Sequence, residues 1–306
     1  MILHTLLVVA IVVGTVATVG ATLDRTARWI DREFRHARAL RVVVAWLGVC
    51  LVAGVLAVAM TTGHAQLAAD TFACCAAVLL LFVLIAAPYL RRTAPVTLRP
   101  RRILAIGAHP DDLELACGAT LAKLIDQGHE VHTMIMSHGS SGGDQRTRAL
   151  EARNGSLYLR AAGISLLDFE DTALRHNEQG MIAAIERVIG EFRPDVVLTH
   201  SAHDQHQDHD AVHKATMRAA RRSPSILCYE SPSVTRSFSP EFFVDVSTHI
   251  DVKVRAIELH RDQRGKPYMT GARARATAAF RGGQARVGFA EGFEVVRLEA
   301  SAIGEF

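Results

Sequence analysis

Three apolar segments near the N-terminus constrain this chain more than any other feature. Residues 2–22, 42–60 and 71–90 contain no Asp, Glu, Lys or Arg. The length of each segment is close to the about 20 residues that a helix needs to cross a bilayer. No basic residue precedes the first segment, as it would in a signal peptide. The clustering of all three within the first 90 residues favours three transmembrane helices over helices buried in a soluble core.

The arginines that flank these segments predict their orientation. Residues 23–41 hold six Arg, residues 89–102 hold five, and residues 61–70 hold neither Lys nor Arg. Because positive residues accumulate on the cytoplasmic side, the N-terminus is expected outside and everything after residue 91 in the cytoplasm. This pattern predicts a multi-pass protein of the cell membrane.

A second domain follows the apolar segments. We expect a membrane domain over residues 1–92, a Pro- and Arg-containing linker over 93–102, and a further domain over 103–306. Its apolar runs alternate with helical patterns, which predicts βαβ units. The expected fold class is α/β, with a Rossmann-like, mostly parallel sheet and helices on both faces. The predicted strands are 101–108, 130–137, 164–170, 194–200 and 225–230, and the predicted helices are 119–128, 146–161, 181–192 and 211–222.

Composition excludes several classes of function. The net charge of +3 is small, and no nucleic-acid-binding motif is present, so no nucleic-acid partner is expected. The five cysteines form no Cys-x-x-Cys pair, which argues against a disulfide framework or a cysteine zinc site. No Gly-x-Gly-x-x-Gly follows the first strand, so a dinucleotide site is not expected.

Two polar clusters follow predicted strands of the sheet. AHPDDLE (108–114) comes after the first strand and HSAHDQHQDHD (200–210) after the fourth. Ligands of such sheets bind beyond the carboxyl ends of the strands. His109 and Asp112 with one histidine of the second cluster would form a two-His, one-carboxylate site with an open position, as in catalytic zinc sites. Asp111 would then be available as a general base.

These clusters resemble the PIG-L/LmbE-like family of zinc-dependent de-N-acetylases, which act on N-acetylglucosaminyl compounds. The resemblance covers roughly residues 103–300 and not the apolar segments. It is carried by AHPDDLELACGAT (108–120), RPDVVLTHSAHDQHQDHDAV (193–212), VDVSTHIDVKVRAIELHRDQ (244–263) and AEGFEVVRL (290–298).

The resemblance implies roles for individual residues. The metal ligands would be His109, Asp112 and His209, holding Zn²⁺, or another divalent metal such as Fe²⁺. Asp111 would be the general base. His206 would stabilise the oxyanion as an imidazolium. Asp208 would support the site by orienting a histidine and could also cap the following helix.

Further residues match the family less closely. Asp171, Arg148 and His260 are candidates for substrate binding, and Arg146 and Arg153 compete with Arg148. Glu114 is expected to be structural. His200 and His203 stay open between a substrate-edge and a merely solvated role. For His213, a plain helix face is favoured over metal ligation.

The expected activity is metal-dependent removal of an acetyl group from an N-acetylated amino sugar, lipid-linked because of the membrane helices, at the cytoplasmic membrane face. Two alternatives use the same residues. A non-haem Fe(II) oxygenase also takes two histidines and a carboxylate, although the βαβ pattern opposes it. A non-catalytic, membrane-tethered glycan-binding protein is the other alternative, against which the complete set of site residues counts.

Overall fold

The computed structural model describes the backbone of residues 2–299 and the side chains of residues 6–299. The chain forms two compact units, residues 1–92 and residues 93–306. Each unit has its own helices and its own packed interior, and each is described separately below.

The N-terminal unit is helical. α1 packs against α3, and α3 packs against α4. Small residues allow the close approach of α1 and α3, since a Cβ on Gly48 would lie 2.6 Å from the carbonyl oxygen of Gly14. Such small-residue contacts are typical of helices packed within membranes. The elements are α1 (Ile2–Thr22), α2 (Asp24–Glu33), α3 (Ala37–Met60), α4 (His64–Ala86) and the 3₁₀ turn η1 (Ala87–Leu90).

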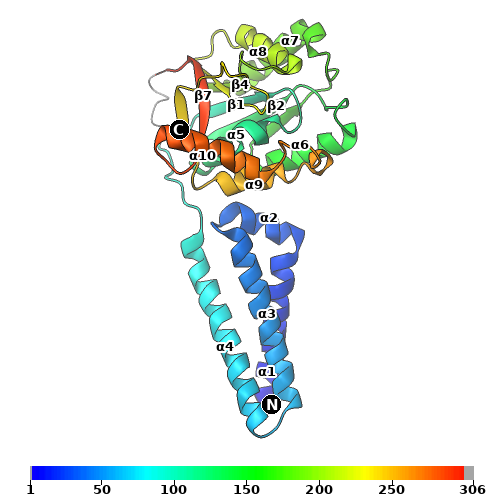
Figure 1. The fold of residues 1–306 in the computed structure, drawn as a ribbon, viewed down its shortest axis with the longest axis vertical. Coiled ribbons are helices and arrows are strands. Elements are labelled where there is room, and N and C mark those ends of the chain that lie inside the picture. Colours follow the sequence, from blue (N-terminus) through cyan, green and yellow to red (C-terminus); the bar gives the residue numbers. More distant parts are fainter. Residues whose placement is uncertain (1, 300–306) are drawn as a thin grey trace. The chain divides into compact units, whose positions relative to one another are not determined.

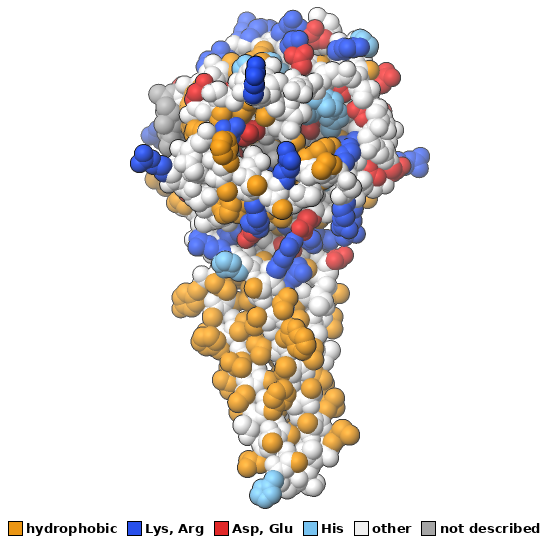
Figure 2. All heavy atoms as spheres, in the orientation of Figure 1, with side chains coloured by type: hydrophobic (Ala, Val, Ile, Leu, Met, Phe, Trp, Pro, Cys, Tyr) orange, Lys and Arg blue, Asp and Glu red, His pale blue; other side chains and the backbone are white. Residues whose placement is uncertain are grey.

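Two helical segments of the described chain are long and apolar enough to span a membrane, Ala37–Met60 and His64–Leu90. The predicted third span is not confirmed: Leu6–Thr22 meets the same criteria only together with α2, from which it is bent by 75°. Hydrophobic side chains cover most of the visible surface of the N-terminal helices (Figure 2). Membrane association is therefore supported by two helices rather than by three.

In the N-terminal unit, arginine side chains bind acidic side chains and carbonyl oxygens of α2. Arg92 donates hydrogen bonds to the carbonyl oxygens of Asp31 and Arg32 at the end of α2, at 2.8 and 2.9 Å. Arg91 lies 2.9 Å from Glu33, and Arg41 lies 2.9 Å from Asp31. Arginines from the start of α3 and from the C-terminal end of this unit thus hold α2 in place.

A seven-stranded sheet organises the C-terminal unit (Figure 1). Its order is β3-β2-β1-β4-β5-β7-β6, in which β1 to β5 are parallel and β7 runs antiparallel to β5 and β6. The strands are β1 (Arg102–Gly107), β2 (Glu130–Ile135), β3 (Gly163–Leu166), β4 (Val196–His200), β5 (Ser225–Tyr229), β6 (Phe242–Asp245) and β7 (Ala290–Arg297).

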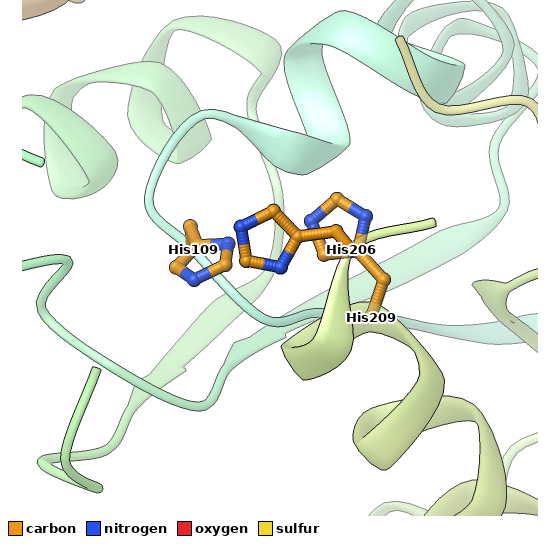
Figure 3. Close-up of side chains that lie close together, drawn as sticks. All are labelled: His109, His206 and His209. Carbon is orange, nitrogen blue, oxygen red and sulfur yellow. The ribbon is translucent and has the colours of Figure 1, made fainter. Parts of the chain in front are cut away.

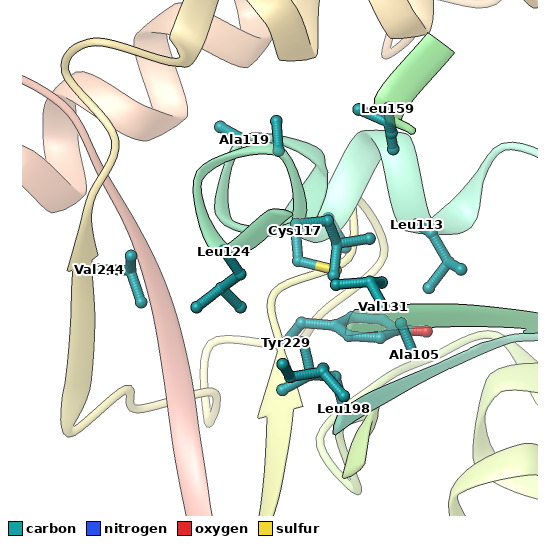
Figure 4. Packing of buried hydrophobic residues seen from close by; sticks show 14 of the residues in the cluster. Ala105, Leu113, Cys117, Ala119, Leu124, Val131, Leu159, Leu198, Tyr229 and Val244 are labelled. Atoms are coloured by element: carbon teal, nitrogen blue, oxygen red, sulfur yellow. The ribbon is translucent and has the colours of Figure 1, made fainter. Parts of the chain in front are cut away.

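Helices cover both faces of the sheet (Figure 1). One buried cluster joins the sheet to α5, α6 and α9, and the other joins it to α7 and α8. In the first cluster the Tyr229 ring lies beneath α5 (Figure 4), and its hydroxyl donates to the carbonyl oxygen of Ile106 at 2.6 Å. The helices are α5 (Asp112–Asp126), α6 (Gln145–Leu159), α7 (Glu178–Phe192), α8 (Gln207–Ala219), α9 (Ile250–Ile257) and α10 (Gly271–Ala285), with 3₁₀ turns η2 (Leu174–Asn177) and η3 (Arg261–Gln263).

The predicted α/β class is confirmed, and two details of the prediction are wrong. β6 and β7, which extend the sheet in the antiparallel sense, were not predicted. The helix predicted over residues 119–128 begins at Asp112, so part of the AHPDDLE motif is helical, and only Cys117 interrupts it with φ −131° and ψ 18°. The motif therefore lies at a strand-to-helix junction, not in a separate loop.

Candidate metal centre

The two polar clusters meet beyond the carboxyl ends of β1 and β4. These strands are parallel neighbours, so the residues that follow them come together, as expected for such a sheet. The centroid of the His109 ring lies 4.8 Å from that of His206 and 5.4 Å from that of His209 (Figure 3). All three rings line a cavity of about 340 Å³.

Asp112 lies at the centre of the cluster. Its Oδ2 accepts hydrogen bonds from the backbone N–H groups of Ala108 at 2.9 Å and His109 at 2.7 Å. Its Oδ1 lies 3.3 Å from His209 Nε2, and its Oδ2 lies 3.5 Å from His109 Nδ1. The turn after β1 therefore fixes this carboxylate between the two imidazoles.

The far side of the His109 ring is held by two carboxylates. Its Nε2 lies 3.0 Å from Asp171 Oδ1 and 3.3 Å from Asp208 Oδ2. Burial lowers the pKa of His109, but Asp112, Asp171 and Asp208 outweigh burial and raise the pKa well above its usual value. With Nε2–H donated to these carboxylates, the lone pair of Nδ1 faces Asp112 and is available to a metal.

His209 is anchored in the same way. Its Nδ1 lies 2.8 Å from Asp204 Oδ2, which leaves Nε2 directed at Asp112. Asp204 in turn accepts hydrogen bonds from Ser231, from Ser233 at 2.7 Å, and from the backbone N–H of His206 at 2.9 Å. Burial lowers the pKa of His209, but Asp112 and Asp204 outweigh it and raise the pKa to about 9.

These contacts leave a donor set that fits a divalent cation. The other polar atom of each of these three side chains is already hydrogen-bonded. This leaves His109 Nδ1, one oxygen of Asp112 and His209 Nε2 for a cation, and the carboxylates around them favour positive charge at this position. Two imidazoles and a carboxylate are the ligand types that zinc and iron(II) take. Within the described residues, three overlapping groups hold ligand atoms within 4.8 Å of one another: His109, His206 and His209; Asp112, His200 and His209; and His109, Asp171 and Asp208.

Asp111 lines the same cavity from the turn before α5. Its Oδ1 lies 3.3 Å from Nη2 of Arg148, which also donates from Nη1 to the carbonyl oxygen of Gly139 at 2.5 Å. Gly139 has φ +69°, and a Cβ there would collide with this guanidinium. The glycine-rich loop thus makes room for the arginine that holds Asp111. Of the three competing arginines, Arg148 is the one that lines the cavity.

His206 caps the N-terminus of α8 with its side chain. Its Nδ1 accepts a hydrogen bond from the backbone N–H of Asp208 at 3.2 Å. Burial and the nearby His209 and His109 lower the pKa of His206. Both facts favour the neutral imidazole with its proton on Nε2, rather than the imidazolium that the sequence led us to expect. A neutral Nε2–H still suffices to donate a hydrogen bond into the cavity.

The structure changes the expected roles of three residues. Asp208 does not cap α8, because its carboxylate accepts from the backbone N–H of Thr172 at 2.7 Å and contacts His109. Asp171 lines the cavity, but its oxygens contact His109 and the backbone N–H of Ser141. His260 does not reach the cavity: it is buried behind it, 3.5 Å from Glu114.

The remaining histidines divide between the interior and the surface. His200 is fully buried, accepts from the backbone N–H of Ala108 at 3.1 Å and stacks on His209 at 3.8 Å, so it is not solvated. His213 Nδ1 lies 2.8 Å from the carbonyl oxygen of His200 and is occupied there. His203 is partly exposed and pairs with Glu294 at 2.7 Å.

Sequence reasoning missed Asp204. It lies within the second cluster, five residues before His209, and nothing in that spacing separates it from Asp208 or Asp210. The general rule that a metal-binding histidine donates its other N–H to a carboxylate predicts that such a partner exists. Only the fold shows which aspartate reaches Nδ1.

Comparisons of sequence place this chain among known proteins. The profile of the PIG-L family, described as GlcNAc-PI de-N-acetylase, matches residues 104–220. The uncharacterized deacetylase YaiS of Escherichia coli is 40% identical over 166 residues, which cover 52% of this chain and 90% of that protein. The diacetylchitobiose deacetylase of Thermococcus kodakarensis is 30% identical over 188 residues, which cover 53% of this chain and 70% of that protein.

Solved structures share the fold of the C-terminal unit. The conserved protein TT1542 of Thermus thermophilus superposes with a TM-score of 0.58 at 25% identity, covering 66% of this chain and 98% of that one. N,N'-diacetylchitobiose deacetylase of Pyrococcus horikoshii superposes with a TM-score of 0.57 at 22% identity, covering 66% and 89%. The second likeness concerns the fold alone.

Proposed function

This chain belongs to the PIG-L family, and from that premise we propose that it is a metal-dependent hydrolase that removes the acetyl group of an N-acetylglucosaminyl-type substrate. The observation that supports the proposal is the position of Asp112 between the two histidines, with Oδ2 3.5 Å from His109 Nδ1 and Oδ1 3.3 Å from His209 Nε2. The curated relatives reported above are deacetylases by name.

The proposed metal ligands are His109, Asp112 and His209, and the proposed metal is Zn²⁺, with Fe²⁺ as the alternative. A bound divalent cation supplies a Lewis acid that polarises a carbonyl and lowers the pKa of a water molecule. The donor set fits this use because three protein ligands leave a coordination position open. Asp208 and Asp204 position the two histidines through their outer nitrogens.

Asp111 is the proposed general base. Its carboxylate lines the cavity beside the ligands, and the ion pair with Arg148 orients Oδ1. Oδ2 then accepts a proton from the attacking water and can return it to the departing amine. A base in this position needs only hydrogen-bond reach of the water.

His206 is the proposed donor to the oxyanion. Because Nδ1 accepts from the start of α8, the ring is oriented with Nε2–H available to the cavity. A preorganised donor of this kind lowers the barrier because it meets the charge that develops on the carbonyl oxygen. Arg148 and Asp171 are the proposed substrate-side residues of the opposite wall, whereas His260 is no longer a candidate.

We further propose a division into a membrane domain (residues 1–92), a linker (93–102) and a deacetylase domain (103–306). From the flanking arginines we propose that the deacetylase domain lies in the cytoplasm and the N-terminus outside. A lipid-linked glycan is then the proposed substrate form, met at the cytoplasmic face. Neither the oxygenase nor the glycan-binding alternative is supported by a specific feature of the site or by the curated relatives reported above.

The test uses the full chain in detergent, loaded with Zn²⁺ and given N-acetylglucosamine and diacetylchitobiose. We expect acetate release under anaerobic conditions, which excludes the oxygenase alternative. Asp111→Asn is expected to keep the metal and lose turnover. Asp210→Asn, an exposed aspartate paired with Lys214 on α8, serves as the matched control and is expected to keep both. Wild-type turnover in Asp111→Asn would contradict the assignment of the base.

A further inference from the structure

A second cavity adjoins the proposed catalytic one. It has a volume of about 240 Å³ and shares Leu115, Pro232 and Tyr268 with the catalytic cavity of about 340 Å³. Ligand sites usually measure about 300–1,000 Å³, so the second cavity alone is small and the first lies at the lower end. A ligand that extends past Tyr268 would use both.

The two carboxylates in the wall of the second cavity are already neutralised. Glu291 accepts from Lys253 Nζ at 2.6 Å and from the backbone N–H of Thr120 at 2.7 Å. Glu230 is bound by both ends of the Arg281 guanidinium at 2.7 and 2.8 Å. Neither acid therefore offers an unbalanced negative charge to a ligand.

Two cations that line these cavities have no acidic partner among the described residues. Lys266 lines the catalytic cavity and Arg273 lines the second one. Among residues 6–299 no carboxylate lies within 4.0 Å of either side chain, and Lys266 Nζ lies over the Tyr268 ring, 5.9 Å from its centroid. Arg273 also lies in the first turn of α10, where the helix dipole favours negative charge.

We propose that the second cavity binds, where it adjoins the catalytic one, an anionic group on the aglycone of the substrate, held by Arg273 of the second cavity and Lys266 of the catalytic cavity. The inference rests on the proposed deacetylase function and adds the chemical class of the group next to the sugar. The acetamido sugar occupies the catalytic cavity, and the anion lies beyond Tyr268. The two unpaired cations supply the charge that a phosphate or carboxylate requires.

The first test compares two substrates that differ in this group. N-acetylglucosamine 1-phosphate is anionic, and methyl N-acetylglucosaminide is neutral. In the full chain loaded with Zn²⁺, Arg273→Gln and Lys266→Gln are each expected to lower the ratio of kcat/KM for the anionic over the neutral substrate by about tenfold, mainly through KM. Arg187→Gln, an exposed arginine of α7 on the opposite face of the sheet, is the matched control.

If the ratio of kcat/KM for the anionic over the neutral substrate is unchanged in both variants, the proposal is overturned. This holds whether the activities on the two substrates fall together or both stay at the wild-type level. A source in a lipid headgroup is distinguished by a third substrate, an N-acetylglucosaminyl phospholipid in phosphatidylcholine vesicles. A kcat/KM that depends on Arg273 with either phosphate substrate supports the proposal. The substrate that shows this dependence identifies the source of the anion.

Binding of products separates this inference from the proposed function. Glucosamine 1-phosphate is expected to bind more tightly than glucosamine by calorimetry, and Arg273→Gln is expected to remove the difference. If the wild-type chain binds in this way but releases no acetate from any substrate, the deacetylase proposal fails and the anion site stands. If acetate is released but no preference for the anionic substrate depends on Arg273 or Lys266, the anion site alone is refuted.

Discussion

Replacing Asp204 by Asn tests the reasoning about the metal centre most directly. The carboxylate is surrounded by hydrogen-bond donors: the Nδ1–H of His209, the hydroxyls of Ser231 and Ser233, and the backbone N–H of His206. Burial raises the pKa of Asp204, but these donors outweigh it, led by His209, and the pKa falls well below its usual value. An ionised group therefore holds the imidazole.

The magnitude follows from this environment. Loss of a carboxylate partner behind a metal-binding histidine costs about 10–100-fold in metal affinity, which equals about 1.4–2.8 kcal/mol. Asn keeps the shape of Asp204 but has one acceptor oxygen, so its amide NH₂ would face groups that are themselves donors. We expect the loss to lie near the hundredfold end, because the side chain of Asp204 is fully buried.

The assay is competition for Zn²⁺ between the full chain and a chromophoric chelator. Thermal unfolding of the metal-free variant shows whether the fold is kept. Asp210→Asn, four residues along α8 from His206, is expected to bind Zn²⁺ as the wild type does. Metal affinity of Asp204→Asn within twofold of the wild type, in a folded protein, would refute the proposed ligand role of His209 Nε2.

Four further results are expected. Removal of metal by a chelator should abolish acetate release, and Zn²⁺ should restore it. His206→Ala should lower kcat by about 10²–10³-fold with metal affinity kept, and an equal loss of metal would instead make His206 a ligand. Glu291→Ala should lower the stability of the C-terminal unit by about 3–5 kcal/mol, because it leaves a buried ammonium unpaired, measurable as a lower Tm. Gly48→Leu should loosen the packing of α1 on α3 and lower the Tm of the full chain in detergent, whereas Val49→Leu, on an exposed face, should not.

The α/β fold class could be predicted because buried parallel strands appear in the sequence as continuous apolar runs. β4 is buried throughout and β1 is buried after its first residue, and both were predicted within one or two residues. β6 has four residues, and β7 contains Gly292 and ends in exposed positions. Such a strand carries a weak local pattern, and its place in the sheet is set by pairing with β5, far away along the chain.

The start of α5 shows a second limit of local reasoning. Cys117 departs from helical geometry, and the residues after it donate to Glu291 instead of continuing a regular ladder. Glu291 lies on β7 and makes the kink tolerable by accepting those N–H groups. The helix was predicted only from residue 119, whereas α5 runs from Asp112 through the kink, where a distant carboxylate and Lys253 satisfy the backbone.

By itself the sequence determined which segments are apolar, which strands alternate with helices, and that two polar clusters follow strands at the same edge of one sheet. These properties depend on local composition and on the right-handed sense of the connections between parallel strands. Tertiary structure decided which atom of each side chain faces the centre: Asp204 rather than Asp208 holds His209, and Asp171 contacts His109. Hydrogen-bond partners are chosen by distance in space, and residues that are equivalent in a list of aspartates differ by several ångströms once the chain is folded.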